Sequence, residues 1–363
     1  MGGVRGRDFL TMRERSLEFI VPGDLSSATG GYIYDRRIVE GLRGSGWRVA
    51  VHELDASFPF PTPAALDHAR DVFGRLQDGA LTVVDGLAFG AMPEVVSRHA
   101  GRVRIVALVH HPLAKENGLS PVLADQLAQS ERAALRSARH VVVTSEATAD
   151  ALISYDVPRG SISVVMPGTD DVPLARGSAD GVPNLLCVAT LIPRKGHDLL
   201  IDSLHALARV PWRLTCAGSL VRSPETAARV QSKVRDAGLA ERVYFAGELN
   251  GGELGRLYES ADLFVLSTRY EGYGMAVAEA LAFGLPVVST RTGGIPELVA
   301  ERAGLLVPPD DGVSFGKALV RVLTDNALLA ALREGARERR SRLPRWPQSC
   351  AKMSQVLEGV MSA

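Results

Sequence analysis

The sequence predicts an α/β fold of two Rossmann-like, doubly wound domains that face each other across a cleft. Short runs rich in β-branched residues alternate with helical patterns along the chain, which is typical of parallel α/β units. A length of 363 residues exceeds what one ordinary core accommodates. A tract over residues 168–183, rich in Gly, Pro, Asp and Ser, interrupts the alternation and is typical of a linker.

The alternation places six strands on each side of this linker. A helix over Tyr32–Arg43 is expected after the first strand, and a terminal helix follows the second domain. The expected strands are Glu18–Val21, Val49–Leu54, Leu81–Asp85, Arg104–Val109, His140–Thr144 and Ser163–Met166, then Leu185–Ala189, Arg213–Ala217, Val243–Ala246, Leu263–Leu266, Pro286–Ser289 and Gly304–Val307. The expected segments are a loose extension over 1–15, an N-terminal Rossmann-like domain over 16–167, the linker over 168–183, a C-terminal Rossmann-like domain over 184–344, and a helix over 345–363 packing back toward the N-terminal domain.

Composition and charge exclude several classes of function. With 46% hydrophobic and 23% charged residues, the chain has the composition of a globular protein. Lys+Arg and Asp+Glu both number 41, and this zero net charge argues against nucleic acid as a partner. No apolar run approaches the roughly 18–20 residues needed to span a bilayer, and no signal-peptide pattern is found. We expect a cytoplasmic protein, and a peripheral contact with the inner face of the membrane is left open.

The helical stretch 121–139 is the one considered for such a contact. Its arginines alternate with acidic residues, including Asp125 and Glu131, which is typical of a solvated face.

Neither a cofactor nor a metal is expected. Cys187, Cys216 and Cys350 are far apart and form no metal-ligand pair in the sequence. Cys187 and Cys216 lie inside apolar runs, so we expect buried core thiols. There is no D-x-D pair to hold a divalent ion against a diphosphate, no Walker A loop, no G-x-S-x-G elbow and no H-E-x-x-H helix.

The most informative motif runs from Glu271 to Glu279 and follows a buried strand. Gly272 and Gly274 allow close approach of a ligand, and the free amides near Met275 attract phosphate at the start of a helix. The two carboxylates suit hydroxyl groups of a sugar and a ribose. A Gly-rich turn with two solvated acids is the plainer alternative.

Two further strand ends carry candidate groups. Arg194 and Lys195 follow the first strand of the C-terminal domain and could neutralise a diphosphate, although a basic pair is more often a surface feature. His110 and His111 end the fourth strand of the N-terminal domain, where an imidazole could orient a sugar hydroxyl. We expect a role for at least one of the two histidines.

Gly30 and Gly31 follow the first strand, just before Tyr32. They permit close approach of a ligand, and tight-turn packing is the equally weighted alternative.

Together these motifs resemble the family-4 retaining glycosyltransferases, which have the GT-B fold. The features that match are Gly30-Gly31, His110, Arg194-Lys195-Gly196, the E-x7-E from Glu271 to Glu279, Phe245-Ala-Gly247, Ala261-Asp262 and the run from Pro286 to Glu297. The resemblance covers nearly the whole chain from Leu17 and is strongest over residues 185–310.

The resemblance implies transfer of a sugar from a UDP- or GDP-type nucleotide-sugar donor to a hydroxyl acceptor, without a metal and with retention of anomeric configuration. It makes the domain over 16–167 the acceptor side and the domain over 184–344 the nucleotide-sugar donor domain. It places the diphosphate on Arg194 and Lys195, the ribose on Glu279, and the sugar hydroxyls on Glu271. The other donor contacts that it implies are Gly30, Gly31, Thr190, Gly247, Leu249, Gly272, Tyr273, Gly274 and Met275. His110, Arg194, Lys195 and Glu271 are the expected catalytic set, and His111 and Tyr32 lie on the acceptor or donor-sugar side.

Two departures and two alternatives accompany this interpretation. Thr190-Leu191 stands where the family usually has Gly-Arg, and His110-His111-Pro112 differs from the commoner single His-Asp form. The acceptor, whether a small molecule, a lipid or a saccharide, cannot be read from the residues. A nucleotide-sugar 2-epimerase of the same fold and a sugar-nucleotide-binding or scaffold protein without transferase activity are the alternatives.

Overall fold

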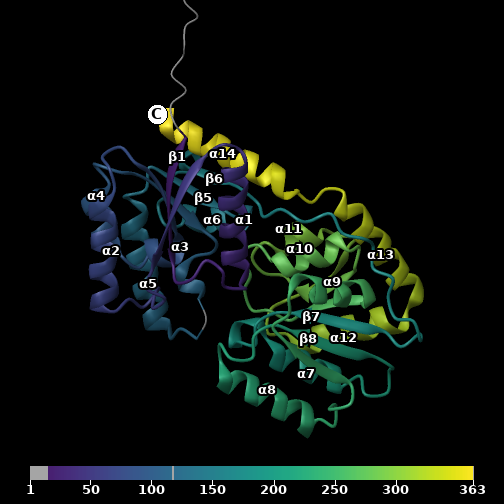
Figure 1. Ribbon diagram of the computed structural model, residues 1–363. Helices are drawn as coiled ribbons and strands as arrows, with labels where there is room; N and C mark the ends of the chain where they lie inside the picture. Colours follow the sequence, from purple (N-terminus) through teal and green to yellow (C-terminus); the bar gives the residue numbers. More distant parts are fainter. Residues whose placement is uncertain (1–14, 117, 363) are drawn as a thin grey trace, which may run out of the picture.

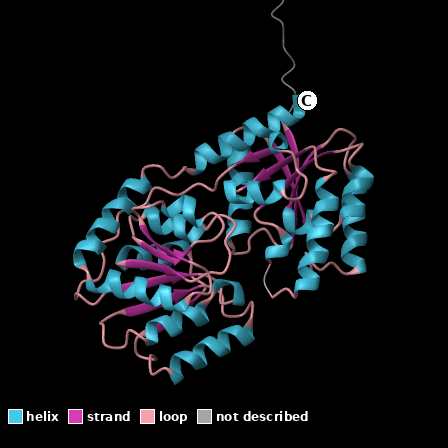
Figure 2. Cartoon of the chain, turned by 180° about the vertical axis from the view of Figure 1, so that it is seen from behind, coloured by secondary structure: helices cyan, strands magenta, loops and turns pink. Residues whose placement is uncertain are grey.

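Two parallel α/β sheets, one in each half of the chain, organise the fold. The computed structural model describes residues 15–116 and 118–362, so the extension expected over residues 1–15 lies outside the described residues but for Arg15. Helices flank the strands in both lobes (Figures 1 and 2). This architecture confirms the fold class that the sequence predicts.

Each sheet has six strands. The N-terminal sheet has the order β2-β1-β3-β4-β5-β6, and the C-terminal sheet the order β12-β11-β10-β7-β8-β9. The strands are β1 (Ser16–Pro22), β2 (Arg48–Leu54), β3 (Leu81–Asp85), β4 (Arg104–Val109), β5 (His140–Val143), β6 (Ile162–Val164), β7 (Asn184–Val188), β8 (Arg213–Ala217), β9 (Val243–Gly247), β10 (Leu263–Leu266), β11 (Val287–Thr290) and β12 (Gly304–Val307). Every expected strand is present, with ends shifted by at most two residues.

Helices connect successive strands and end in α14, which follows the second sheet. They are α1 (Gly30–Gly44), α2 (Pro63–Arg75), α3 (Gly86–Phe89), α4 (Pro93–His99), α5 (Pro121–Leu135), α6 (Glu146–Ile153), α7 (His197–His205), α8 (Pro224–Asp236), α9 (Gly251–Ser260), α10 (Met275–Ala282), α11 (Ile295–Val299), α12 (Gly312–Thr324), α13 (Asn326–Arg340) and α14 (Trp346–Ser362). Short 3₁₀ turns lie at Leu113–Lys115, Arg159–Ser161 and Pro193–Lys195. Local signals start several helices: Thr62 and Ser120 cap α2 and α5, each followed directly by a proline.

The strand orders determine where ligands can bind. In each sheet the order reverses direction once, between β1 and β3 and between β7 and β10. Ligands of open parallel sheets bind outside the carboxyl ends of the strands at such a switch point. The segments that follow β1, β3, β7 and β10 are therefore the structural candidates for a site.

Helix α14 joins the second lobe back to the first (Figure 1). It packs along α1, and its buried side chains Trp346, Met353 and Leu357 belong to one of the two hydrophobic clusters of the N-terminal sheet. The Trp47 indole donates a hydrogen bond to the Ser354 hydroxyl at 2.9 Å. The end of the chain is thus part of the N-terminal core.

The acidic residue of α5 differs from its sequence-based prediction. Glu131 does not lie on a solvated face, because its side chain is fully buried. One carboxylate oxygen accepts a hydrogen bond from the Leu113 amide at 2.9 Å, and the other has no partner among the described residues. Burial raises the pKa of Glu131 to about 8, against the opposing effect of the Leu113 hydrogen bond.

Replacing Glu131 by glutamine is expected to remove a pH-dependent loss of stability. When an acid has a higher pKa in the folded than in the unfolded state, the protein loses stability as pH rises from about 4.5 to about 8, here by up to about 5 kcal/mol. Glutamine keeps an acceptor for the Leu113 amide and does not ionise. Urea unfolding at pH 5 and pH 8.5 should give a smaller stability difference for Glu131→Gln than for the unchanged chain. If the free energy of unfolding changed equally with pH in both proteins, the raised pKa of Glu131 would be contradicted.

Candidate active site

The carboxyl ends of β7 and β10 bring two predicted groups into contact. Lys195 follows β7 and Glu271 follows β10, and these strands are neighbours at the switch point of the C-terminal sheet. The Lys195 ammonium donates to the Glu271 carboxylate at 2.5 Å, with side chains 18% and 10% exposed. A nearly buried ion pair at this edge of the sheet fits a binding site better than a solvated surface feature.

The charges around this pair support each other. Although burial opposes ionisation, Lys195 and Arg194 hold the pKa of Glu271 below its usual value. Burial lowers the pKa of Lys195, against the opposing effect of Glu271. Arg194 donates to the Tyr270 carbonyl at 2.8 Å, so its guanidinium lies beside the same loop. This edge of the sheet therefore carries two cations and one carboxylate.

A left-handed glycine shapes the loop that carries both cations. Gly196 has φ +69°, and a Cβ there would lie 2.1 Å from the Ser267 carbonyl oxygen. The Ser267 hydroxyl donates to the Gly196 carbonyl at 2.6 Å, and the Arg269 amide donates to the Arg194 carbonyl at 2.7 Å. The loop after β7 is thus attached directly to the segment after β10, and only glycine allows this approach.

Helix α10 presents its N-terminus next to the ion pair. Gly274 caps the helix in the left-handed conformation, with φ +98°, and Met275 is its first residue. The first amides of a helix lack partners within the helix and favour an anion. One turn further, Glu279 accepts a hydrogen bond from the Tyr258 hydroxyl at 2.9 Å. Burial raises the pKa of Glu279 to about 7.

The remaining donor-side candidates lie around this edge with different exposures. Thr190 and Leu249 are partly buried, and Gly247 has φ +72° with open space where a Cβ would lie. Tyr273 is buried in the C-terminal core, and its hydroxyl donates to the Pro167 carbonyl at 3.4 Å. Because the Tyr273 side chain is packed in this core, its backbone is the part that can contribute to the site.

The N-terminal sheet meets this edge at Gly272. A Cβ on Gly272 would lie 2.1 Å from the His110 carbonyl oxygen, and the Ser145 hydroxyl donates to the Gly272 carbonyl at 2.7 Å. A Cβ on Gly30 would lie 3.5 Å from the Met275 sulfur, and one on Gly31 would lie 3.4 Å from the His110 ring. The glycine pair after β1, His110 after β4 and the start of α10 are therefore neighbours.

His110 lies in a buried cluster with two aspartates. Its Nε2 is 3.1 Å from an Asp35 oxygen and 3.3 Å from an Asp85 oxygen. Burial opposes protonation, but the two carboxylates outweigh it and raise the pKa of His110 to about 10. Burial likewise raises the pKa of Asp35 to about 6, although His110 opposes this. The two carboxylates therefore favour the imidazolium form of His110.

Sequence reasoning missed both aspartates. Asp85 ends β3 at the carboxyl edge of the sheet, the same placement that pointed to His110, so the strand-end rule could have found it. Asp35 lies on the buried face of α1, and no local sequence pattern distinguishes a buried carboxylate there from an exposed one.

The two other N-terminal candidates are already engaged. His111 Nε2 lies 2.5 Å from a Glu116 oxygen, and its ring packs near Tyr270 at 6.0 Å between centroids. The Tyr32 hydroxyl donates to the Pro22 carbonyl. His111 therefore lies next to the loop after β10, whereas the Tyr32 hydroxyl faces the end of β1.

Two groups among the described residues place three possible metal ligands within 4.8 Å of one another. The first is Asp35, Asp85 and His110. In this group both carboxylates contact the same nitrogen of His110, so the two acids share one imidazole as their partner. The second is Cys187, His197 and Cys216. His197 begins α7, two residues after Lys195. Cys187 and Cys216 are buried thiols, as predicted, but they are not far apart, because β7 and β8 are adjacent.

The two parallel α/β lobes define the architecture of the chain, and comparisons with known proteins define its family. The family "Glycosyl transferases group 1" matches residues 174–339, and "Glycosyltransferase Family 4" matches residues 36–172. The two matches together cover most of the chain, which belongs to the group 1/family 4 glycosyltransferases, as the sequence motifs indicated.

Individual relatives extend this result. The chain is 32% identical over 251 residues to a mannosylfructose-phosphate synthase of Agrobacterium fabrum, covering 64% of this chain and 55% of that protein, so the match spans about half of the relative's length. It is 28% identical to a GDP-mannose-dependent alpha-(1-6)-phosphatidylinositol monomannoside mannosyltransferase of Mycolicibacterium smegmatis. That match covers 87% of this chain and 85% of the relative. The structure of a sucrose-phosphate synthase from Thermosynechococcus elongatus superposes with a TM-score of 0.82 at 23% identity, covering 96% and 99%.

None of the described helices is both long and apolar enough to cross a membrane.

Proposed function

We propose that the protein transfers a mannosyl group from GDP-mannose to a hydroxyl acceptor, with retention of anomeric configuration and without a metal on the diphosphate. The observation that carries the proposal is the Lys195–Glu271 ion pair beside the N-terminus of α10, with His110 and its aspartates adjoining it. GDP-mannose is chosen because the M. smegmatis relative, which matches most of the chain, is GDP-mannose-dependent.

The residues divide the work by charge. Arg194, Lys195 and the first amides of α10 receive the diphosphate and stabilise the negative charge that grows on it as the sugar leaves. Glu271 already contacts Lys195 and orients its ammonium group. The same carboxylate accepts hydrogen bonds from hydroxyl groups of the sugar. Glu279, one turn into α10, accepts the ribose hydroxyls. Charge supplied by these residues replaces the charge that a divalent ion supplies elsewhere.

The transfer itself needs no protein nucleophile. The bond between the anomeric carbon and the diphosphate oxygen breaks, and the acceptor oxygen bonds to that carbon from the same face. The acceptor proton passes to the leaving phosphate oxygen. The protein holds the reactants and stabilises the separated charges, which are the large contributions in such catalysis.

Thermal unfolding with GDP, UDP, ADP and dTDP is the first test of this proposal. At about a hundred times its dissociation constant, GDP should raise Tm by about 5 °C, and a chelator should not change the shift. A shift with UDP instead would change the donor base. A shift that requires Mg²⁺ would contradict metal independence.

Acceptor-dependent release of GDP from GDP-mannose then separates a transferase from a binding protein. A sugar phosphate and a phosphatidylinositol mannoside represent the chemistries named for two relatives. Release that requires one acceptor, with an α-linked product from the α-linked donor, supports the proposal. Binding of GDP without release in the presence of any acceptor would favour the scaffold alternative, and a C2 epimer of the donor sugar would favour the epimerase.

A further inference from the structure

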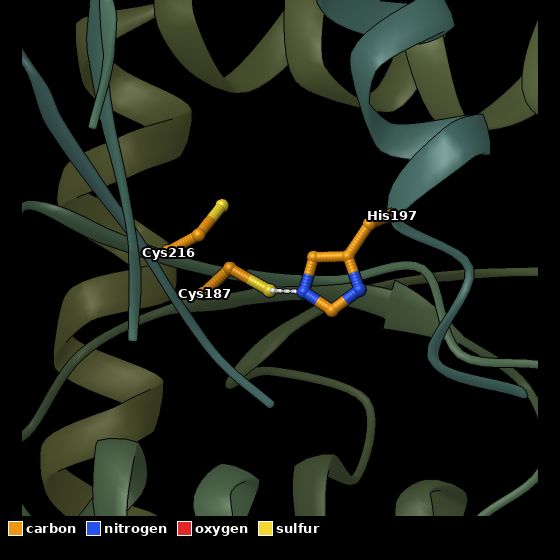
Figure 3. Close-up of side chains that lie close together, drawn as sticks. All are labelled: Cys187, His197 and Cys216. Atoms are coloured by element: carbon orange, nitrogen blue, oxygen red, sulfur yellow. Dashed lines mark hydrogen bonds between the residues drawn. The ribbon is translucent and has the colours of Figure 1, made fainter. Parts of the chain in front are cut away.

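Two cysteines and a histidine meet inside the C-terminal sheet, outside the proposed active site. Cys187 on β7 and Cys216 on β8 are directly paired in parallel register, so their side chains leave the sheet on the same face. His197 is the first residue of α7, which follows β7. Figure 3 shows the imidazole directed at the Cys187 sulfur, with Cys216 alongside. All three residues are at most 2% exposed.

Ordinary packing leaves this cluster incompletely satisfied. The Nε2 of His197 lies 3.7 Å from the Cys187 sulfur, a weak contact, and its Nδ1 has no hydrogen-bond partner among the described residues. A buried imidazole with so little compensation costs free energy. Two thiols beside an imidazole nitrogen form a set of soft metal ligands, and the ligand atoms of the three residues all lie within 4.8 Å of one another.

We propose that Cys187, His197 and Cys216 form a structural site for a thiophilic metal ion, with Zn²⁺ the expected ion. In a tetrahedral zinc site, bonds of about 2.3 Å to sulfur and 2.0–2.1 Å to nitrogen place neighbouring sulfur and nitrogen ligands about 3.6 Å apart. The observed 3.7 Å already fits this spacing. Two thiolates neutralise the ion, so the filled site adds no net charge to the core. Three protein ligands leave the fourth tetrahedral position to a ligand from outside this cluster, such as a water molecule.

Strand geometry favours a metal over a disulfide in this position. Paired residues on adjacent strands of a parallel sheet keep their Cβ atoms about 4.8 Å apart, the spacing of the strands. A disulfide needs Cβ atoms about 3.8 Å apart, and so would require the strands to move together. A bridging ion accommodates the wider spacing without such a movement.

The ion would connect three segments that support the donor site. It would join β7 and β8 to the first residue of α7, two positions after Lys195. This role is structural and separate from the transfer reaction, in which no metal contacts the diphosphate. The proposal does not depend on the identity of the donor or acceptor.

Metal content of the purified full-length protein tests the proposal directly. After expression with added zinc and dialysis against a weak chelator, we expect about one Zn²⁺ per chain by elemental mass spectrometry. Cys187→Ala and Cys216→Ala should each retain less than about a tenth of an equivalent. Cys350→Ala is the matched control, because Cys350 is also a buried thiol but lies on α14, and it should retain the full equivalent.

A spectroscopic arm covers variants that fold poorly. The unchanged chain refolded with Co²⁺ should show a thiolate-to-metal charge-transfer band, which His197→Gln should weaken and Cys350→Ala should preserve. A chelator should lower the Tm of the zinc-loaded protein by about 5 °C, and it should not change the Tm of the Cys187→Ala variant. The proposal is overturned if the unchanged chain holds no zinc and shows no band, if the double variant C187A/C216A keeps the zinc, or if the intact mass reveals a Cys187–Cys216 disulfide.

Discussion

Replacement of Lys195 by alanine is expected to lower kcat by about 100- to 1,000-fold. The ammonium is the nearest fixed cation to Glu271 at the carboxyl edge of the C-terminal sheet, where the proposed diphosphate leaves. Removing one preorganised group that stabilises charge in a transition state typically costs a factor of this size. Initial rates of GDP release at saturating donor and acceptor measure the effect. The Michaelis constant for the donor should rise as well, because the cation also contacts the ground-state diphosphate.

The ion pair complicates this experiment, and a second variant resolves the difficulty. Lys195→Ala leaves the Glu271 carboxylate buried beside Arg194 alone, so stability should fall together with activity. In the double variant K195A/E271Q no carboxylate is left without its cation, and Tm should recover while kcat stays low. Lys233→Ala is the control, because Lys233 forms a surface ion pair with Asp202 on α7 and should leave kcat unchanged. Recovery of turnover in the double variant would mean that Lys195 only supports the fold.

The strand-end rule explains why much of the site could be predicted. Buried parallel strands are continuous apolar runs, and these local runs reveal where each strand stops. Lys195, Glu271 and His110 were singled out because each follows such a run, and the structure brings the first two into contact and the third next to Gly272. The glycines at 272 and 274 belong to the same local signal.

Contacts between distant segments could not be predicted in the same way. The order of strands within a sheet is a tertiary property, so Cys187 and Cys216 gave no sign in the sequence that they pair on neighbouring strands. Asp35 and Glu131 are buried carboxylates, and a charged residue in a helix is by default expected on the solvated face. Their burial is compensated in part by His110 and by the Leu113 amide, partners that lie 75 and 18 residues away in the sequence.

Replacement of Asp35 by asparagine is expected to lower kcat by about 10- to 100-fold and to change its pH dependence. Two carboxylates against one imidazolium give the cluster of Asp35, Asp85 and His110 a net negative charge, which favours the positive character that develops on a sugar ring as the diphosphate leaves. Because the pKa of Asp35 is about 6, this charge is lost as pH falls below that value. The unchanged chain should therefore lose kcat on the acid side with an apparent pKa near 6.

Asp35→Asn should lose the acid limb near pH 6, since the group that titrates there is gone, and its kcat should be lower. Because Asp35 is the main group that raises the pKa of His110, that pKa should fall in the variant, and any remaining pH dependence should follow the histidine. Asp35 acts through His110, so it is a positioning residue, and the pH profile separates this role from a purely structural one. Asp67→Asn is the matched control: Asp67 pairs with Arg70 on the exposed surface of α2 and should leave the profile unchanged. Glu279, with its pKa of about 7, should affect the Michaelis constant for the donor and not kcat at saturation. An acid limb near pH 6 that persists in Asp35→Asn with full kcat would show that the cluster does not influence the transfer step, and the negative charge beside the sugar would then have to come from Glu271.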